Sequence, residues 1–533
     1  MKKKSFVLLF SIVAGVFLCC QSGSHQETAV DGSFRNPVLP GFHPDPSVCR
    51  VGEDFYLVNS TFQFFPGVPI YHSKDLIHWE QIGHCLTRRS QLELRDADFW
   101  GGIYAPTIRY HEGRFYMITT NCTNGGNFFV TAENPAGPWS EPIWVDQGGI
   151  DPTLFFDGGK TYYVGCDDGI VLFEIDPTNG KRLTPSKKIW EGMGGRYPEG
   201  PHLYKKDGWY YLLIAEGGTE MAHSVTIARS KNIWGPYKSN PDNPILTHCS
   251  KKGQYSIIQG LGHADLVEAS DGSWWSVFLG FRWQTGSHHL LGRETFLAPV
   301  VWEKGKWPVV NEGNIITEEM KCRTLPSCLV EEEPSVIRFE GVEGNAVETF
   351  VGNSRYFRLN FLCNPIEENY LLQNDRLRLF AGDRDLDAKG SPTFVGWRQT
   401  DINEKTSIRL DAQGLREGSR AGITVYANGA YHYDVAVVLR NGTPFAQVRY
   451  RLGNLTHVER EVPLSSFVAD LSIQANSETY AFFCNGVLLG EMDARFLSSE
   501  TAGGFTGTYF GAFCEGEGSF ADVFEIRLGE STK

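Results

Sequence analysis

One internal distance recurs five times before residue 275 of this chain and limits the folds that the chain can adopt. The distance is eleven residues, and it runs from a marked position to an aromatic residue in the next apolar run. The five pairs are Asp45 and Tyr56, Ala105 and Tyr116, Asp151 and Tyr162, Glu199 and Tyr210, and His263 and Trp274. A spacing repeated in this way predicts successive copies of one supersecondary unit.

Each copy has the pattern of two short strands joined by a tight turn. A glycine-containing turn precedes every aromatic run, at Gly52, Gly113, Gly158 with Gly159, Gly208 and Gly272. Aromatic and β-branched residues after such a turn are typical of a β-hairpin. Units of about 50 to 60 residues built from short strands favour a β-propeller, in which each blade buries its faces against its neighbours. The sequence therefore predicts an all-β chain with a five-bladed β-propeller over residues 34–320.

The same spacing predicts where the functional residues meet. The first strand of every propeller blade lines the central channel, so equivalent positions converge on one funnel. This geometry would gather Asp45, Asp151 and Glu199 around one pocket, with His263 completing the ring. A proline follows four of the marked positions and indicates a similar backbone kink in each, at Pro46, Pro106, Pro152 and Pro201. The alternative is that these acids are ordinary turn carboxylates, and three acids in one register favour the pocket.

Three inward-facing carboxylates in an aromatic-rich pocket suit glycoside hydrolysis. One acid must protonate the leaving oxygen, and another must activate water or attack the anomeric carbon. Like charges crowded together raise the pKa of at least one of them, so a protonated acid can persist at neutral pH.

Charge and cysteine usage exclude other classes of function. Asp and Glu number 63 against 49 Lys and Arg, a net charge of −14, and a nucleic-acid partner would require a basic face instead. The 12 cysteines include no CxxC pair, so a zinc-ribbon site is not expected, and the sequence leaves disulfide pairing open.

The N-terminal segment has the pattern of an export signal. A basic start over residues 1–4 precedes an apolar run over 5–18 that is too short to span a bilayer, which predicts a signal peptide over 1–20. Cys19 and Cys20 follow directly and resemble the lipidated cysteine of bacterial lipoproteins, so lipid anchoring and simple export both stay open. A polar linker over 21–33 would follow. We expect an exported protein, either periplasmic, anchored to a membrane or extracellular, of undetermined oligomeric state.

A second domain is expected after an acidic run that ends in Pro334. Residues 321–334 are predicted to be a linker. Beyond them, segments 356–361, 407–411 and 433–438 alternate apolar and polar residues, as strands with one buried face do. The sequence predicts a β-sandwich of two packed sheets over residues 335–533.

Several ordered motifs resemble glycoside hydrolase family 43, and in particular its β-xylosidase and α-L-arabinofuranosidase members. In the first domain they lie at residues 36–47, 64–68, 72–76, 101–106, 149–152, 199–202, 262–265 and 291–295. In the second domain, segments 394–399, 421–426 and 504–507 resemble the concanavalin-like domain that accompanies these enzymes. Together these resemblances imply a five-bladed propeller followed by a concanavalin-like sandwich.

The resemblance implies an exo-acting, inverting glycosidase with three catalytic carboxylates. Asp45 would be the general base, Glu199 the general acid, and Asp151 the residue that raises the pKa of the acid and orients it. The substrate would be a terminal β-D-xylose or α-L-arabinofuranose on a xylan-derived or arabinose-decorated plant cell-wall glycan. A loop near residues 505–517 would lean over the funnel and narrow it, which favours release of single sugars.

Further site residues follow from the same resemblance. Arg293 resembles the family's pocket arginine, and the alternative is a strand-end ion pair with Glu294. His263 resembles a channel histidine that lies against a hydrated calcium ion in some members, and the alternative is a satisfied core histidine; no other cofactor is implied. The candidates for the aromatic face that stacks on the sugar, some of which would instead be blade core, are Phe42, Phe64, Trp79, Trp100 and Tyr104.

Two other classes of function remain as alternatives. Retaining fructan hydrolases share this architecture but need an Arg-Asp-Pro middle motif and a Glu-Cys acid, whereas here Asp151 follows Ile150 and Glu199 precedes Gly200. A non-catalytic glycan-binding surface protein would be expected if one of the three acids were replaced. The sequence does not distinguish xylose from arabinofuranose.

Overall fold

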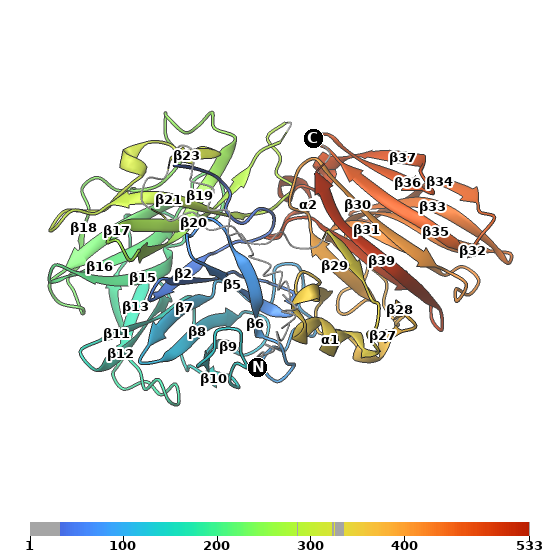
Figure 1. Cartoon of the computed structure of the whole chain (residues 1–533). Coiled ribbons are helices and arrows are strands. Elements are labelled where there is room, and N and C mark those ends of the chain that lie inside the picture. Colours follow the sequence, from blue (N-terminus) through green and yellow to red (C-terminus); the bar gives the residue numbers. More distant parts are fainter. Residues whose placement is uncertain (1–31, 285, 322–324, 326–334, 532–533) are drawn as a thin grey trace, which may run out of the picture.

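The structure is a computed structural model that describes residues 32–284, 286–321, 325 and 335–531. Figure 1 shows two domains side by side, a β-propeller in blue to yellow-green and a β-sandwich in yellow to red. The predicted signal peptide lies outside the described residues, as do nearly all of the two predicted linkers. Within the described residues, no helix combines the length and the apolar character needed to cross a membrane.

The propeller has five antiparallel sheets of four strands, which confirms the predicted blade number. Their strands are β2 (Ser47–Val51), β3 (Asp54–Val58), β5 (Gly67–Ser73) and β6 (Glu80–Leu86); β7 (Thr107–His111), β8 (Arg114–Asn121), β9 (Gly126–Ala132) and β10 (Ile143–Trp144); β11 (Ile150–Asp157), β12 (Lys160–Cys166), β13 (Ile170–Glu174) and β14 (Lys187–Trp190); β15 (Glu199–Lys206), β16 (Trp209–Glu216), β17 (Ser224–Ser230) and β18 (Lys238–Ser239); and β19 (Ile258–Glu268), β20 (Trp274–Arg282), β21 (Glu294–Val301) and β22 (Val309–Val310). The first strands touch in the order β2, β7, β11, β15, β19 and back to β2, so the ring is closed. Outside the blades, β1 (Ser33–Arg35) pairs with β23 (Glu319–Lys321).

The eleven-residue spacing runs from the first strand of each blade, or the residues just before it, around the hairpin turn to the second strand. Its aromatic residue lies on the second strand and packs against the neighbouring blade. The ring pairs are Tyr56 with Phe115 at 5.0 Å, Tyr116 with Phe156 at 5.0 Å, Phe155 with Tyr210 at 6.3 Å, and Tyr204 with Trp274 at 6.5 Å. Aromatic pairs at these distances stabilise contacts beyond the area that they bury. The repeat therefore encodes the contacts between blades as well as the blades themselves.

A buried carboxylate ties four blades together at the hub. Asp265 on β19 is fully buried and accepts hydrogen bonds from Ser47 at 2.7 Å, Arg109 at 2.8 Å and Tyr204 at 2.6 Å. Burial alone would raise the Asp265 pKa, but the Arg109 charge outweighs it and holds the pKa well below its usual range. Residues from four blades thus depend on one ion pair.

The second domain is a sandwich of a nine-stranded and a six-stranded sheet, as predicted. The larger sheet contains β24 (Val336–Arg338), β25 (Gly344–Asn345), β27 (Tyr370–Gln373), β28 (Arg376–Phe380), β30 (Glu404–Asp411), β35 (Val468–Ala475), β36 (Thr479–Cys484), β37 (Val487–Asp493) and β39 (Phe520–Ser531). The smaller contains β29 (Phe394–Arg398), β31 (Arg420–Asn428), β32 (Tyr431–Arg440), β33 (Thr443–Leu452), β34 (Leu455–Pro463) and β38 (Tyr509–Glu515). Short helices are η1 (Asn311–Gly313), α1 (Ala346–Gly352), η2 (Ser354–Tyr356), η3 (Glu367–Asn369), η4 (Ala494–Leu497) and α2 (Ser499–Ala502).

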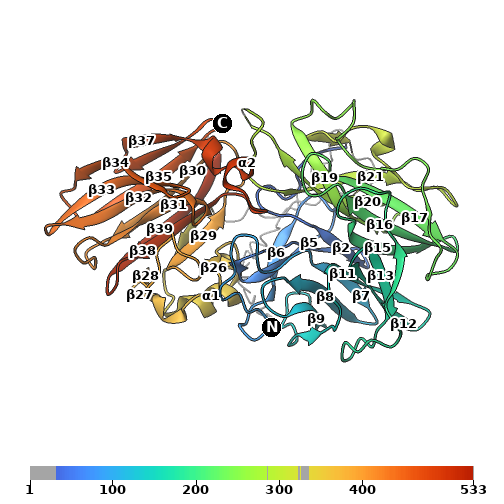
Figure 2. The same ribbon diagram turned by 180° about the vertical axis from the view of Figure 1, so that it is seen from behind.

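The two domains share a small sheet and an apolar cluster. Strand β4 (Phe64–Phe65) of the propeller pairs with β26 (Phe361–Leu362) of the sandwich. Phe64 stacks on Tyr509 with ring centroids 3.9 Å apart, and Arg398 donates to the carbonyl oxygen of Phe42 at 2.7 Å. Figure 2 shows β26 and α1 on the side of the sandwich that faces the propeller. The sandwich is therefore bonded to the segments of the propeller that lead into the channel.

The hub ion pair predicts a large effect of one substitution. Asp265→Asn should lower the free energy of unfolding by roughly 3 to 5 kcal/mol, because the largely buried Arg109 would lose its counter-charge. Urea unfolding followed by tryptophan fluorescence at neutral pH measures this. The Asp265 pKa is depressed in the folded protein, so its contribution is present above the ordinary aspartate pKa and is lost as the pH falls toward the depressed value. The difference from the parent should therefore narrow toward acid.

The matched control is Glu303→Gln, at an exposed carboxylate between β21 and β22 of the same blade. It should change the unfolding free energy by less than about 0.5 kcal/mol. A similar, small effect of both substitutions would contradict the structural role of the hub pair.

Candidate active site

A cavity of about 600 Å³ lies at the mouth of the propeller channel, and both domains line it. Asp45, Asp151 and Glu199 all reach this cavity from three different blades, and His263 reaches it from a fourth. Asp45 and Asp151 are buried, while Glu199 is half-buried at the cavity wall. The fold thus gathers the carboxylates that the shared spacing singles out.

The backbone at the channel mouth is in an unusual conformation. Asp45, Asp151 and His263 have φ values of 52°, 53° and 45°, in the left-handed region that residues with a Cβ seldom adopt, and Gly200 beside Glu199 has a φ of 57°. Strand pairing also shifts register between Ile150 and Thr153 and again just after Glu199. Bulges and strained residues of this kind redirect side chains and concentrate at functional sites. The expected kink is therefore present at Asp45, at Asp151 and beside Glu199, but Ala105, before Pro106, is not in the left-handed region. Where it is present, the kink turns these side chains into the cavity.

Asp45 is surrounded by groups that favour its charged form. Arg293 donates from Nη1 to Asp45 Oδ1 at 2.8 Å, and Ser60 donates from Oγ to Oδ2 at 2.5 Å. His263 Nδ1 lies 3.7 Å from Oδ1. Burial alone would raise the Asp45 pKa, but Arg293, His263 and the Ser60 hydrogen bond outweigh it and lower the pKa below its usual value. Asp45 is therefore a carboxylate at neutral pH.

Glu199 and Asp151 have the opposite electrostatics. Burial raises the Glu199 pKa to about 7, and the negative charge of Asp45 adds to this rise. Burial and then the charges of Glu199 and Asp45 also raise the Asp151 pKa. Near neutral pH this pair retains a proton that Asp45 has lost. The cavity therefore presents an ionised carboxylate and a protonated acid to the same space.

Arg293 is buried between two aromatic rings, one from each domain. Its guanidinium carbon lies 5.5 Å from the centroid of Phe62 and 5.3 Å from that of Phe505, and its Nε donates to the Phe505 carbonyl oxygen at 3.3 Å. Its Nη2 is buried and has no hydrogen-bond partner among the described residues. Glu294 pairs with Arg282 at 2.7 Å, so the alternative of an Arg293–Glu294 ion pair is wrong. A buried donor left without a partner at a cavity can serve a ligand hydroxyl.

The five predicted aromatic residues divide into two groups. Trp100 and Tyr104 line the cavity. Phe42 and Phe64 are fully buried in the cluster between the domains, because the sandwich packs on them, and they do not line the cavity. Trp79 lies in the outer turn of the first blade, where its Nε1 donates to the Leu76 carbonyl oxygen at 2.9 Å. The prediction that these last three stack on a sugar is wrong.

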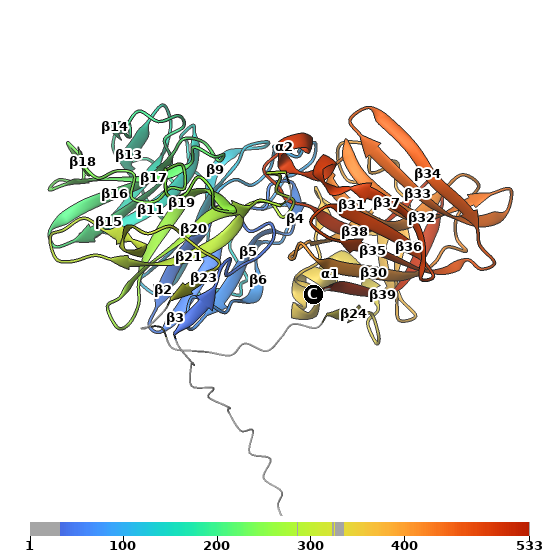
Figure 3. The same ribbon diagram turned by 90° about the horizontal axis from the view of Figure 1, so that it is seen from above.

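Several lining residues had no motif to mark them in the sequence. Phe62 and Thr219 lie in connecting segments outside the blade repeat, and Thr219 accepts a hydrogen bond from Arg293 at 3.2 Å. Phe505 and the segment that begins with helix α2 come from the sandwich, and Figure 3 shows α2 between the two domains. The expected loop over the funnel thus ends soon after Phe505, because Tyr509–Glu515 is a buried strand. Gly503 and Gly504, directly before Phe505, were the sequence signal from which this loop could have been predicted.

His263, the residue expected to lie against a hydrated calcium ion, has the Asp45 carboxylate and Gly200 as neighbours. Calcium takes six to eight oxygen ligands, and the described residues include no group of three or more His, Cys, Asp or Glu that could hold a metal. The channel also carries its own cation, because the Arg109 guanidinium lies 2.8 Å from both Asp265 and His202. His263 instead packs on Gly200 and faces Asp45, which favours the interpretation as a core histidine with a polar neighbour.

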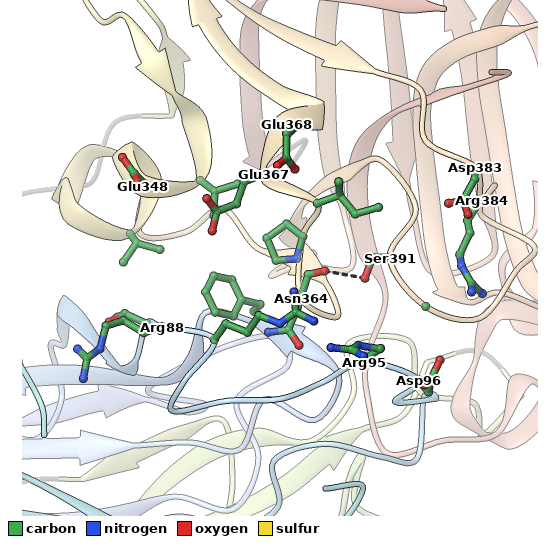
Figure 4. Close-up of a pocket in the computed structure, with 18 residues that line it drawn as sticks. Arg88, Arg95, Asp96, Glu348, Asn364, Glu367, Glu368, Asp383, Arg384 and Ser391 are labelled. Atoms are coloured by element: carbon green, nitrogen blue, oxygen red, sulfur yellow. Dashed lines mark hydrogen bonds between the residues drawn. The ribbon is translucent and has the colours of Figure 1, made fainter. Parts of the chain in front are cut away.

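A second cavity of about 780 Å³ lies between the domains on another face (Figure 4). Its labelled side chains are mostly charged, and several have partners: Arg88 pairs with Glu141 at 2.7 Å, and Ser391 donates to the Asn364 carbonyl oxygen at 2.6 Å. The aromatic residue that lines it, Phe65, is buried. Sugar binding favours an exposed aromatic face, so this cavity does not have the character of the first one.

Comparison with known proteins agrees with the geometry of the first cavity. Residues 34–308 match the family model for glycosyl hydrolases family 43, and residues 347–524 match that for the β-xylosidase C-terminal concanavalin A-like domain. A non-reducing-end α-L-arabinofuranosidase of Bacteroides ovatus is 40% identical over 498 residues, which covers 91% of this chain and 92% of that protein. A xylosidase/arabinosidase of Butyrivibrio fibrisolvens is 40% identical over 525 residues, which covers 92% and 97%.

Solved structures are similar over both domains. The structure of GH43B from a Bacteroides ovatus xyloglucan PUL has a TM-score of 0.88 at 39% identity and covers 94% of this chain and 100% of that chain. Xylan β-1,4-xylosidase from Bacillus halodurans C-125 has a TM-score of 0.85 at 34% identity and covers 93% and 99%. The chain belongs to glycosyl hydrolases family 43 and is a glycosidase.

Proposed function

We propose that this protein is an exo-acting, inverting glycosidase that releases terminal β-D-xylose or α-L-arabinofuranose from xylan-derived or arabinose-decorated glycans. The observation that carries the proposal is the pairing of an ionised Asp45 with a protonated Glu199 around one cavity. The named activities of the relatives, α-L-arabinofuranosidase and xylosidase/arabinosidase, support the choice of pentose.

The proposed reaction divides the chemistry between the two acids. Glu199 donates its proton to the glycosidic oxygen as the bond to the anomeric carbon breaks. Asp45 accepts a proton from a water molecule as the oxygen of that water bonds to the opposite face of the same carbon, so the configuration inverts. Protons then balance, because one carboxyl group loses a proton and the other gains one.

Asp151 and Arg293 support this division. Asp151 accepts the backbone N–H of Gly200 at 3.1 Å, a bond that stabilises a carboxylate and leaves the shared proton to Glu199. Arg293 keeps Asp45 ionised and has Nη2 available for a sugar hydroxyl. Because the Phe505 loop of the sandwich covers one side of the cavity, the site suits the end of a glycan chain more than its middle.

Neither alternative function gains support. The three acids share one cavity, whereas a non-catalytic binding protein has no need to keep an unequal pair of protonation states. The relatives named above are arabinosidases and xylosidases, and fructan hydrolysis is not among their named activities.

Parallel assays with two substrates test the proposal. The parent should hydrolyse 4-nitrophenyl β-D-xylopyranoside, 4-nitrophenyl α-L-arabinofuranoside or both. Glu199→Gln should lower kcat for an unactivated substrate such as xylobiose by about 10²-fold to 10⁴-fold, the usual contribution of a general acid. Asp45→Asn should lower kcat on activated and unactivated substrates alike, because the water would lose its base.

The control is Glu133→Gln, at an exposed carboxylate outside the cavity, which should leave the rates unchanged. Proton NMR of the first sugar released should show the inverted anomer. A parent that cleaves no pentoside, or a Glu199→Gln variant as active as the parent, would refute the assignment.

The pH dependence of kcat/KM should reflect the two pKa shifts. Activity should decline as the pH rises through about 7, because Glu199 with its raised pKa then loses the proton that it must donate. On the acid side, activity should persist to below the ordinary pKa of an aspartate, since Asp45 stays ionised there. Initial rates from pH 3 to pH 9 with an unactivated pentoside that the parent cleaves, such as xylobiose or methyl α-L-arabinofuranoside, measure both limbs. A profile that stays level from pH 6 to pH 9 would be inconsistent with Glu199 as the acid.

We infer that the protein is exported, from the basic start and the apolar run at residues 1–18. When the chain is expressed with this segment in a bacterial host, it should leave the cytoplasm. Intact-mass measurement distinguishes the two routes, since lipidation begins the mature chain at Cys19 or Cys20 with an added acyl mass, and simple export adds none. An uncleaved chain in the cytoplasm would contradict export.

A further inference from the structure

The loop that leads into the general acid wraps around a buried carboxylate that the proposed reaction does not use. Glu216, the last residue of β16, is 2% exposed and does not line the cavity. The backbone N–H of Met193 donates to both of its oxygens, at 2.9 and 3.0 Å, and that of Gly195 donates to Oε1 at 2.9 Å. Thr226 donates its hydroxyl to Oε2 at 2.5 Å. Backbone N–H groups of neighbouring residues that converge on one anion form a nest, and bonds to a charged acceptor are the stronger kind.

The loop is shaped closely to this carboxylate. Gly192 has a φ of 77°, and a Cβ placed there would lie 2.6 Å from Glu216 Oε1. A Cβ on Gly195 would lie 3.0 Å from the Cβ of Glu216. Glycine is therefore required at Gly192, both for the backbone conformation and for the close approach. The sequence Gly-Met-Gly-Gly at residues 192–195, which the blade repeat does not explain, is the segment that surrounds the Glu216 carboxylate.

The anchored loop ends at the acid itself. Tyr197 has a φ of 51° and lines the cavity, and Pro198 and Glu199 follow it directly. The N–H of Gly217, next to Glu216, donates to the carbonyl oxygen of Arg196 at 2.7 Å. Hydrogen bonds therefore hold the loop as far as Arg196, the residue before Tyr197. A strained residue such as Tyr197 keeps its conformation when the surrounding structure fixes it. The Glu216 carboxylate supplies part of that fixation.

We propose that Glu216 is a positioning residue that holds the general acid Glu199 at the glycosidic oxygen through loop 192–198. This inference rests on the proposed function. Glu216 does not line the cavity, and Glu199 pairs across the strands with Ala215, the residue before Glu216. The Glu216 side chain therefore acts on catalysis through the backbone of the loop that it holds. Misplacement of a catalytic group by about 1 Å lowers rates by about 10²-fold. Loosening the loop should therefore impair proton donation and leave water activation by Asp45 intact.

Leaving groups of different acidity separate these two steps. A 2,4-dinitrophenolate departs without a proton, whereas a sugar or methoxide leaving group needs one. In Glu216→Ala, kcat/KM for xylobiose or methyl α-L-arabinofuranoside should fall by about 10²-fold, and kcat/KM for the 2,4-dinitrophenyl glycoside of the same pentose by less than about 3-fold. The basic limb of the pH profile should move to lower pH, because a freed Glu199 is better solvated and its pKa returns toward the ordinary value.

Two milder variants keep the test valid if Glu216→Ala folds poorly. In Glu216→Gln the amide oxygen can accept the two backbone N–H groups and the amide NH₂ can donate to Thr226, so most of the activity on xylobiose should be retained. Thr226→Val removes one donor to the carboxylate and should produce the same leaving-group dependence to a smaller degree. The matched control is Glu191→Gln, an exposed acid next to the loop that pairs with Lys188 and should resemble the parent on every substrate.

The outcomes distinguish this inference from the proposed function. Equal losses on activated and unactivated substrates in Glu216→Ala and Thr226→Val, or no loss in either, would overturn the positioning role of Glu216. A parent that hydrolyses none of these glycosides would instead refute the proposed function. A loss confined to poor leaving groups, with Glu216→Gln close to the parent, would support the inference.

Discussion

The chemistry of the cavity depends on one cation, Arg293, that bonds to Asp45 and to neither of the other two catalytic carboxylates. Burial raises the pKa of Glu199 and that of Asp151, and the negative charge of Asp45 adds to both rises. The Arg293 guanidinium bonds to Asp45, at 2.8 Å, and the Ser60 hydroxyl adds a second bond to the same group. Asp45 thus ionises easily, and its charge makes ionisation of Glu199 harder. The same arrangement that disfavours burial of three acids gives two of them the different protonation states that an acid and a base require.

This arrangement of three acids and one cation requires a scaffold that prevents the like charges from moving apart. The propeller provides it by closing a ring of first strands, with aromatic pairs between neighbouring blades. Asp265 and Arg109 fix four blades beneath the cavity by one buried ion pair. Because the carboxylates project from the ends of these strands, they can separate only if the ring itself deforms. Strain at Asp45 and Asp151, with φ values of 52° and 53°, is tolerated for the same reason.

The sequence was sufficient where the information is local and periodic. The spacing from Asp45 to Tyr56 recurs because every blade begins with the same kind of hairpin, so the blade number and the convergence of the acids could both be derived from it. The sequence was insufficient where burial depends on a distant segment. Phe42 and Trp100 are both aromatic residues near family motifs, but the sandwich covers Phe42 and leaves Trp100 at the cavity. The sequence also did not predict that Arg109 would place a positive charge in the channel. Arg109 and His263 come from different blades, and no spacing along the chain connects them.

The sandwich affects the chemistry through Arg293 as well as through the shape of the cavity. Arg293 Nε donates to the Phe505 carbonyl oxygen, and the guanidinium lies between the rings of Phe62 and Phe505. Without Phe505 this cation would lose a hydrogen bond and the ring on one side, and water would reach it. Water would weaken the attraction between Arg293 and Asp45, because the interaction of two charges falls as the local dielectric rises. The ionisation of the base is therefore set jointly by the two domains, although Asp45, Asp151 and Glu199 all belong to the propeller. This coupling explains why a domain that contributes none of the three catalytic acids is bonded so closely to the segments around Phe42 and Phe64.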